Sequence, residues 1–493
     1  MLPKIIILRY RLIILLAAFL FNTLAFSTTV LYTYAQHMRP KYFLKSGKIA
    51  GFCHDILLAL NEELRSEGIE IRYKNDALMA TTEILNALER NEIQIFVGLG
   101  YSDSYGRRFN FVKTPLYGMR EVFLIRISQH ESIYSQRIVN VGVLKGTVPS
   151  ARVKEVFEGL RLVQFDNIDD AIKALDKGQI DTIYGGALVL GSYVKDNPKK
   201  YQLLGVFTDK FYHYVVVNRT VDTNVVTKLE RAIKRIHEKR VIEKIIKKNN
   251  LGDFVLPGNV VEILLIDWRP YEWYDKVEKR WKGVDVDVVS SVFKKLGFVT
   301  EFVSFPWERC LQAMRALAYD GIMSLRKSRE REEFLVFPDE PLSTGVDLLF
   351  KMKNKQLDIS RLENIPEDVV CGYTLGYAYG DWFWNAKFKK EAVATDELGF
   401  RMLKRGKIDL FICNLLVAKH LLRELRMENE VEHSKNFGEV MIYHIAFSKN
   451  YHGQYLASLF GPELRKFKKT TEYSKILQRY GLKYEDFWSS FVY

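Results

Sequence analysis

Hydrophobic residues follow two different spacings along this chain. In residues 81–90 the apolar positions recur every three or four residues, which is typical of a helix with one buried face. Residues 93–98 form a short and nearly continuous apolar run, which favours a buried strand. The two patterns alternate from Val30 onward, with a further helix at residues 55–67 and a strand at 70–73. This alternation predicts a lobe with a mostly parallel sheet flanked by helices.

The same alternation continues and then starts again in the second half of the chain. Residues 251–259 are rich in turn-forming residues and lie between the two halves. The first half continues with a strand and glycine turn at 141–147, a helix at 168–177, strands at 180–184 and 213–218, and a closing helix at 225–249. The second half begins with a strand at 260–266, has its own strand and glycine turn at 371–376, and ends its last helix near 479–482.

Four short motifs occur twice in the same order, at offsets between 226 and 232 residues. Residues 51–56 match 283–288, 109–116 match 335–342, Gly178-Gln179-Ile180-Asp181 matches Gly406-Lys407-Ile408-Asp409, and Tyr212-His213 matches Tyr443-His444. Each match alone is weak, but a common order predicts a duplicated domain of about 225 residues. A length of 493 residues, 48% apolar and 27% charged, agrees with two globular domains of this size.

The N-terminus has the pattern of a targeting segment. Lys4, Arg9 and Arg11 precede an apolar run at residues 12–24, and small residues follow at 25–27. Because the run is shorter than the ~20 residues that span a bilayer, we expect a signal peptide at residues 1–27, with an uncleaved membrane anchor as the alternative. The first cysteine is Cys53, so lipid attachment at a processed N-terminal cysteine is not expected.

The net charge of +13 raises the question of an anionic partner. The densest basic cluster lies at residues 228–248, where apolar residues recur at helical spacing between the lysines and arginines. We interpret it as the solvated face of an amphipathic helix, and we expect no nucleic-acid partner for an exported protein. Cys53, Cys310, Cys371 and Cys413 lack the spacing of a metal site, so no metal or other cofactor is expected.

The second half carries the most informative motif. Phe305-Pro306-Trp307-Glu308-Arg309 is followed by Asp320-Gly321-Ile322, by Arg331 in a charged run, and by residues 337–342. This order strongly resembles the first-lobe signature of the family 3 extracellular solute-binding proteins, the two-lobed receptors of bacterial ABC importers. The resemblance implies two tandem α/β Venus-flytrap units, each of two lobes, at residues 28–250 and 260–493, joined by a linker at 251–259.

The resemblance also implies a binding site in the second unit. Trp268 and Tyr271 would lie on the first loop, with Trp268 the better candidate for the aromatic contact. Trp307 would be a second aromatic contact, and Ser324 and Ser328 would lie on the turn before Arg331. Arg331, six residues before Phe337, would hold a ligand carboxylate through two parallel hydrogen bonds. In the alternative interpretation Trp268 and Trp307 are core residues, and Arg331 pairs with Glu330 or Glu332.

The departures from the family pattern restrict the ligand. Asn414 stands where amino-acid receptors of the family have an aspartate for the ligand ammonium group, so we expect ordinary α-amino acids to bind poorly. In the first unit, Gly186 is at the position of this aspartate, and Tyr105 is at the position that corresponds to Arg331. Arg107 and Arg108 are the substitutes that the first unit offers, and that unit is either a divergent binding domain or a spacer or docking domain.

The sequence therefore predicts a monomeric periplasmic receptor for a small polar or anionic, amino-acid-like solute, with an inner-membrane ABC permease as partner. Two other functions are kept open: an exported sensor or scaffold that binds a partner through this fold, and a dehydratase-like enzyme. His54, His213 and His444 are isolated, so no catalytic pair is expected. Cys371 and Cys413 fall on strands that are neighbours in the family fold. The resemblance therefore allows a disulfide between them, with two buried, reduced thiols as the alternative.

Overall fold

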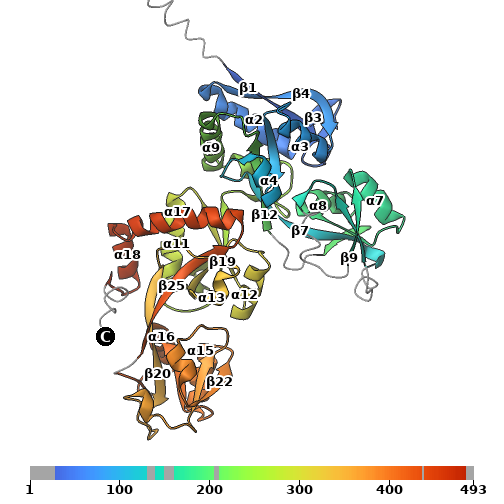
Figure 1. Ribbon diagram of the computed structural model, residues 1–493. Coiled ribbons are helices and arrows are strands. Elements are labelled where there is room, and N and C mark those ends of the chain that lie inside the picture. Colours follow the sequence, from blue (N-terminus) through green and yellow to red (C-terminus); the bar gives the residue numbers. More distant parts are fainter. Residues whose placement is uncertain (1–27, 130–138, 149–159, 205–209, 436–437, 485–493) are drawn as a thin grey trace, which may run out of the picture. The chain divides into compact units, whose positions relative to one another are not determined.

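The computed structural model describes residues 28–129, 139–148, 160–204, 210–435 and 438–484. The expected signal peptide at residues 1–27 lies outside them. The chain forms two compact units (Figure 1). The first comprises Met1–Leu116, Ile125–Tyr201 and His213–Asp253, and the second comprises Tyr117–Leu124, Gln202–Tyr212 and Phe254–Tyr493. A domain boundary at residues 251–259 stays a prediction from the sequence; that segment holds β13 (Leu256–Pro257), which pairs with β7 (Tyr117–Arg126).

The first unit alternates strands and helices as predicted. Its first lobe contains β1 (Thr29–Gln36), β2 (Phe43–Lys45), β3 (Lys48–Ala50), α2 (Phe52–Leu64), β4 (Ile69–Met79), α3 (Thr81–Glu89), β5 (Ile95–Gly100), α4 (Asp103–Arg108) and β6 (Asn110–Phe111). The second lobe contains β8 (Val139–Leu144), β9 (Leu160–Phe165), α7 (Ile168–Asp176), β10 (Thr182–Gly186) and α8 (Ala187–Asp196). Strands β11 (Tyr201–Leu204) and β12 (Lys210–Val217) follow in the chain, and the division above assigns the end of β11 and the start of β12 to the second unit.

The predicted helix at residues 225–249 is in fact two helices, α9 (Thr223–Glu238) and α10 (Val241–Lys248). The break falls at Arg240, whose left-handed φ of 53° ends the regular helical path. The hydrophobic spacing alone did not show this break, because buried residues such as Ile236 and Ile242 face the core on both sides of it.

The first lobe of the second unit follows the same plan. It contains β14 (Val260–Leu265), β15 (Trp273–Asp275), β16 (Arg280–Lys282), α11 (Val284–Lys295), β17 (Val299–Ser304), α12 (Trp307–Arg315), β18 (Gly321–Arg326), α13 (Arg329–Glu332) and β19 (Leu335–Val336). Helices α17 (Tyr451–Phe467) and α18 (Thr471–Arg479) complete the unit at its C-terminal end.

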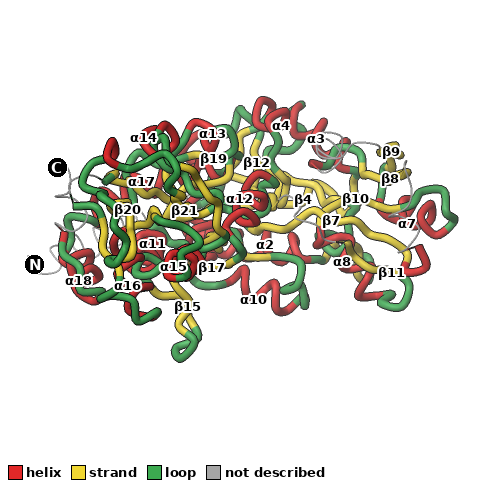
Figure 2. The backbone as a smooth tube through the Cα atoms, turned by 90° about the horizontal axis from the view of Figure 1, so that it is seen from below, coloured by secondary structure: helices red, strands yellow, loops and turns green. Residues whose placement is uncertain are grey.

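The second lobe is built on the continuation of the same sheet. It contains β20 (Ser343–Met352), β21 (Val370–Thr374), α14 (Asp381–Asn385), β22 (Lys389–Val393), α15 (Asp396–Lys404), β23 (Leu410–Asn414), α16 (Leu415–Glu424), β24 (Val431–His433) and β25 (Glu439–Ser448). Strand β25 pairs with β18 through Tyr443–Phe447 and with β20 through Glu439–Tyr443. It therefore runs from one lobe into the other (Figure 1). Figure 2 shows the strands and helices of the same backbone in a second view, with β20 and β21 labelled.

The two large sheets have the same strand order. The first runs β5-β12-β7-β10-β8-β9, and the second contains the equivalent series β18-β25-β20-β23-β21-β22. The side pairings also correspond, since β6 pairs with β12 as β19 pairs with β25, and β11 pairs with β7 as β24 pairs with β20. The α/β fold of two tandem, two-lobed units that the sequence predicted is therefore confirmed.

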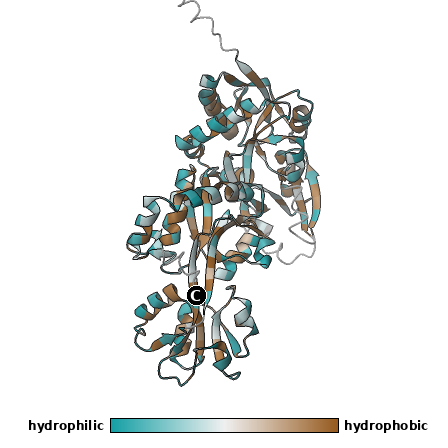
Figure 3. Ribbon diagram, turned by 60° about the vertical axis from the view of Figure 1, so that its left-hand side comes forward, coloured by the Kyte–Doolittle hydropathy of each residue, from teal (hydrophilic) through white to brown (hydrophobic). Residues whose placement is uncertain are grey.

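Hydrophobic residues are frequent along the strands of both large sheets (Figure 3). In the second lobe of the second unit, a separate core contains Phe383, Phe388 and Cys371. Cys371 and Cys413 are free, buried thiols, as are Cys53 and Cys310. Among the described residues, no helix is long and apolar enough to cross a membrane, and no cluster of three or more metal-ligating side chains occurs.

One glycine occupies the same turn in each unit. Gly51 and Gly283 have φ angles of 128° and 135°, a region that L side chains rarely adopt. A Cβ atom on Gly283 would lie 2.1 Å from the carbonyl oxygen of Tyr271, and one on Gly51 would lie 2.4 Å from that of Lys41. The first turns of α2 and α11 are therefore packed directly against the preceding loop.

We expect Gly283→Ala to lower the free energy of unfolding of the second unit by at least about 2 kcal/mol, since the Cβ would overlap backbone. All 7 tryptophans of the chain lie at or after Trp268, so urea unfolding followed by tryptophan fluorescence reports on this unit. Gly297→Ala is the control: its φ is also positive, at 84°, but the Cβ would meet no atom within 4 Å. Equal losses in the two variants would show that the overlap plays no part.

Candidate functional site

A pocket in the second unit lies where its two lobes meet. The first lobe contributes residues from the loop after β14 and from α12, β18 and α13. The second lobe contributes the loop after β21, the start of α15 and the end of β23, and strands β20 and β25 contribute the remaining residues. The pocket is lined by Ile266, Trp268, Glu272, Trp307, Ser324, Leu325, Arg326, Arg331, Asp347, Tyr377, Ala378, Tyr379, Asp396, Cys413, Asn414, Met441 and Tyr443.

Arg331 is the central cation of this pocket. Its side chain donates to the carbonyl oxygens of Arg326, at 2.7 Å, and Gly376, at 3.0 Å, and its guanidinium lies 5.4 Å from the Trp307 ring centroid. It is only 5% exposed, and burial lowers its pKa to about 10. Within the described part of the chain, no carboxylate lies within ion-pair distance of it. The buried charge is thus held by two carbonyl dipoles and by the face of the Trp307 ring.

The alternative in which Arg331 pairs with a neighbouring glutamate is wrong. Glu330 pairs with Arg315 at 2.6 Å, and Glu332 pairs with Lys327 at 2.9 Å, so both acids lie on the surface of α13. Arg331 projects the other way because Ser328 caps the helix by accepting a hydrogen bond from its backbone N–H, at 3.3 Å. Ser328 therefore has a structural task, and it is not part of the pocket lining.

The two lobes touch each other at Gly376. The Trp307 indole N–H donates to the Gly376 carbonyl oxygen at 2.8 Å, so this one oxygen receives hydrogen bonds from Trp307 and from Arg331. Gly376 belongs to the loop after β21 in the second lobe, whereas both donors belong to the first lobe. The residues predicted to contact a ligand thus also hold the lobes together.

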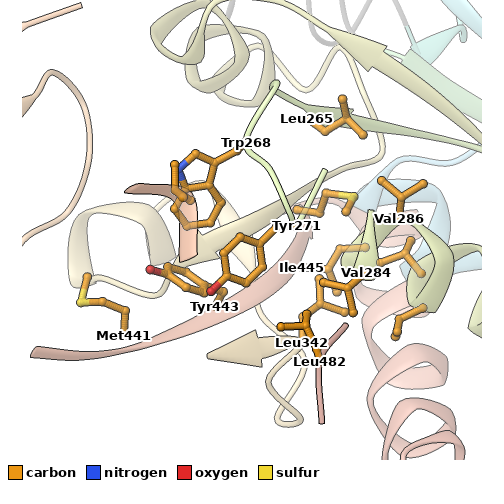
Figure 4. Close-up of a cluster of buried hydrophobic side chains, with 14 of the residues drawn as sticks. Leu265, Trp268, Tyr271, Val284, Val286, Leu342, Met441, Tyr443, Ile445 and Leu482 are labelled. Carbon is orange, nitrogen blue, oxygen red and sulfur yellow. The ribbon is translucent and has the colours of Figure 1, made fainter. Parts of the chain in front are cut away.

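Trp268 forms the aromatic wall of the pocket together with Tyr443 (Figure 4). The Trp268 ring stacks on Tyr271 at 4.6 Å and meets the edge of Tyr443 at 5.0 Å. Tyr271 is fully buried behind Trp268, where its hydroxyl donates to the Thr344 carbonyl oxygen, and it does not line the pocket. The preference for Trp268 over Tyr271 on the first loop fits this placement.

Asn414 and Ser324 line the pocket but are engaged with protein groups. The side-chain oxygen of Asn414 caps α16 by accepting hydrogen bonds from the backbone N–H groups of Leu416 and Val417. Its side-chain NH2 group donates to the Tyr443 hydroxyl at 3.0 Å. The Ser324 hydroxyl lies 2.7 Å from Glu272 and 2.9 Å from Asp285. One hydroxyl proton cannot serve two carboxylates, so one of these acids is protonated; burial raises the pKa of Asp285 to about 7 and that of Glu272 well above its ordinary value.

The structure also brings carboxyl groups into the pocket that the sequence analysis did not identify. Asp347, on β20, lies opposite Asn414 and is 6% exposed; Asp396, at the start of α15, is 8% exposed. The expectation that ordinary α-amino acids bind poorly rested on Asn414 alone and took neither of these acids into account. A charged residue within the apolar run of β20 was the available signal, because buried aspartates are rare without a partner or a function.

These two acids have different surroundings. Asp396 accepts hydrogen bonds from Thr374 at 2.5 Å and from the Trp268 indole at 3.1 Å. Burial raises the pKa of Asp347 to about 8, helped by the negative charge of Asp396. Arg326, which acts in the opposite direction, pairs with Glu439 at 2.8 Å rather than with Asp347.

The corresponding place in the first unit is occupied differently. The Tyr105 hydroxyl donates to the Gly146 carbonyl oxygen at 2.7 Å, as Arg331 donates to Gly376 in the second unit. Arg107 is exposed, and Arg108 pairs with Glu89 at 2.7 Å. Gly186 precedes α8 and offers no side chain, so the described part of this unit has no equivalent of the Arg331 arrangement.

The comparisons with known proteins include a family match within the second unit. Residues 263–483 match the model of the bacterial extracellular solute-binding proteins, family 3, so the chain contains a domain of that family. The putative ABC transporter arginine-binding protein 2 of Escherichia coli (strain K12) is 23% identical over 237 residues, which are 48% of this chain and 95% of that protein. A probable histidine-binding protein of Neisseria gonorrhoeae is 24% identical over 212 residues, covering 41% of this chain and 75% of that protein.

A solved structure extends over both units. The B. pertussis BvgS periplasmic domain covers 92% of this chain and 90% of its own, with 13% sequence identity and a TM-score of 0.40.

The raised pKa of Asp347 predicts how the free energy of unfolding depends on pH. The folded protein keeps a proton on Asp347 up to about pH 8, whereas the unfolded chain releases it near pH 4, so this group costs stability as the pH rises between these values. We expect Asp347→Asn to raise the free energy of unfolding by up to about 4 kcal/mol at pH 8 and to change it little at pH 4.

Asp409→Asn is the matched control, because Asp409 pairs with Lys355 and accepts the Val370 N–H at 2.8 Å, and its pKa is lowered by these contacts against the effect of burial. That variant should lose stability at pH 8. Urea unfolding at both pH values, followed by tryptophan fluorescence, measures the difference, and a destabilised Asp347→Asn protein at pH 8 would contradict the expectation.

Proposed function

We propose that the second unit binds a small polar solute through an anionic group, and that the protein is the periplasmic receptor of an ABC-type importer. The observation that carries the proposal is Arg331, a buried guanidinium in a pocket between two lobes whose hydrogen-bond partners, within the described residues, are two carbonyl oxygens. Removing such a charge from water costs several kcal/mol unless an anion compensates it. A carboxylate would supply that anion and match the guanidinium with two parallel hydrogen bonds.

The surroundings of Arg331 support binding in a closed cleft. Trp268, Trp307 and Tyr377 supply flat apolar surface, and Ser324 and Asn414 supply polar groups. Closure of two lobes around a solute excludes water, which strengthens each polar contact. Such hinge closure needs a few segments that cross between the lobes and absorb the change in backbone angles. Strands β20 and β25 are the segments that cross between the lobes here.

The relatives support the class of function. The matched proteins of E. coli and N. gonorrhoeae are described as binding proteins, one of them for an ABC transporter, so we propose binding and transport rather than catalysis. In the same proposal, the shared strand order reflects duplication of one binding domain, and the first unit has lost the arginine site. Residues 1–27 would direct export to the periplasm, where the receptor would meet its permease.

Arg331→Ala should weaken binding of the solute by about 30-fold or more, since a desolvated bidentate contact is worth about 2 to 5 kcal/mol. The measurement is a thermal-shift screen of small metabolites, with affinities of the hits determined by calorimetry. Arg401→Ala is the control, because Arg401 is an exposed arginine on α15 that pairs with Glu397. A hit that binds the Arg331 variant as tightly as the unchanged protein would remove Arg331 from the site.

The importer role has its own test. Deletion of the gene from its host should abolish high-affinity uptake of the radiolabelled solute, and the unchanged gene, but not the Arg331→Ala form, should restore it. Uptake that persists in the deletion strain would favour the sensor or scaffold function, as would a screen without any hit.

A further inference from the structure

Resting on the proposed function, we propose that Asp347 is a specificity-determining residue of the second unit, and that it binds a cationic amine group of the solute. The solute would then carry both an anionic group for Arg331 and an amine for Asp347. The family position for an acid is Asn414, so this role falls on a residue of a different strand, β20.

The position of Asp347 supports this role. It lies on a strand that crosses between the lobes, pairs in register with Asn414 on β23 and with Glu439 on β25, and lines the same pocket as Arg331. Its hydrogen-bonding neighbour is the Tyr443 hydroxyl. In the described part of the chain, no lysine, arginine or histidine lies within ion-pair distance of its carboxyl group.

The other acids of the pocket are less suited to this task. Glu272 is held by the Ile266 N–H and the Ser324 hydroxyl. Asp396 is held by Thr374 and Trp268, so its contribution is to add negative potential beside Asp347. Two neighbouring carboxyl groups repel each other when both are ionised, and an amine cation would relieve this repulsion. Trp268 and Tyr377 add aromatic rings, which also attract cations.

Burial of an unpaired carboxyl group has a consequence that can be measured. With its pKa raised to about 8, Asp347 is mostly protonated at pH 6, and binding of an amine cation must release this proton. Affinity should therefore rise roughly tenfold per pH unit from pH 6 towards pH 8. The charged or titratable groups that face Asp347 are Arg326 on β18, Asp396 on α15, Glu439 and Tyr443 on β25, Tyr271, Tyr379 and Cys413. The tyrosine and cysteine groups stay neutral in this range because burial raises the pKa of each well above its ordinary value.

The experiment compares solutes with and without the amine. The twenty L-amino acids and the amine agmatine are tested beside 2-hydroxy acids of matching shape, such as L-lactate for L-alanine, L-malate for L-aspartate and L-phenyllactate for L-phenylalanine. Thermal shifts identify the hits, and calorimetry gives affinities at pH 6, 7 and 8 for the unchanged protein, Asp347→Asn and Arg331→Ala. We expect an amine-bearing hit whose affinity falls 30-fold or more in Asp347→Asn and loses the tenfold rise per pH unit in that variant.

The outcomes separate the two proposals. Equal binding of an amine-bearing hit by Asp347→Asn and the unchanged protein would overturn the role of Asp347, and so would hits restricted to hydroxy acids. In both cases, loss of binding in Arg331→Ala would leave the proposed function standing. A panel without any hit would overturn this inference together with the proposed function. The Asp396→Asn variant is the matched control for charge, and its effect should be smaller than that of Asp347→Asn.

Discussion

The burial of one guanidinium determines much of the second unit. Arg331 is almost inaccessible to water, yet its side chain bonds only to carbonyl oxygens, one from its own lobe and one from the other. Such an arrangement holds only if the local backbone presents these oxygens accurately. Ser328 caps the short helix that carries Arg331, and Trp307 shares the Gly376 oxygen with it. Arg331 and Trp307 thus join the two lobes at one carbonyl oxygen on the edge of the pocket.

The acids of the pocket are the complement of this cation. Arg331 and Asp347 enter the same cavity from different lobes and are not paired with each other, so the protein keeps two opposite charges apart at the cost of desolvating both. Stability alone would favour pairing them or replacing them by apolar residues. A site that retains both charges is organised for a solute, since binding sites commonly keep groups that reduce the stability of the free protein.

The sequence predicted the fold because its signals are local and repeated. Alternating patterns gave the order of strands and helices, and the matched motifs around Gly51 and Gly283 showed that the order occurs twice. The break between α9 and α10 was missed because a single left-handed residue, Arg240, leaves the hydrophobic spacing unchanged. For the site, the sequence motif led to Trp268, Trp307, Ser324, Arg331 and Asn414, all of which line the pocket. It did not lead to Asp347 or Asp396, because strand pairing and lobe contact bring them there from distant parts of the chain.

The tyrosine of the first unit gives the two halves different electrical properties. Tyr105 makes with Gly146 the bond that Arg331 makes with Gly376, but a phenol is uncharged at neutral pH, and burial raises the pKa of Tyr105 further. Salt does not screen a neutral hydrogen bond, and no counter-ion is needed to complete it. The Tyr105–Gly146 contact of the first unit is therefore electrically neutral and complete. The Arg331–Gly376 contact of the second unit includes a buried positive charge that has no anionic partner among the described residues. Salt and anions should therefore affect the Arg331–Gly376 contact between the lobes of the second unit more than the Tyr105–Gly146 contact of the first. The first unit thus serves as an internal control for the effect of ions on the second.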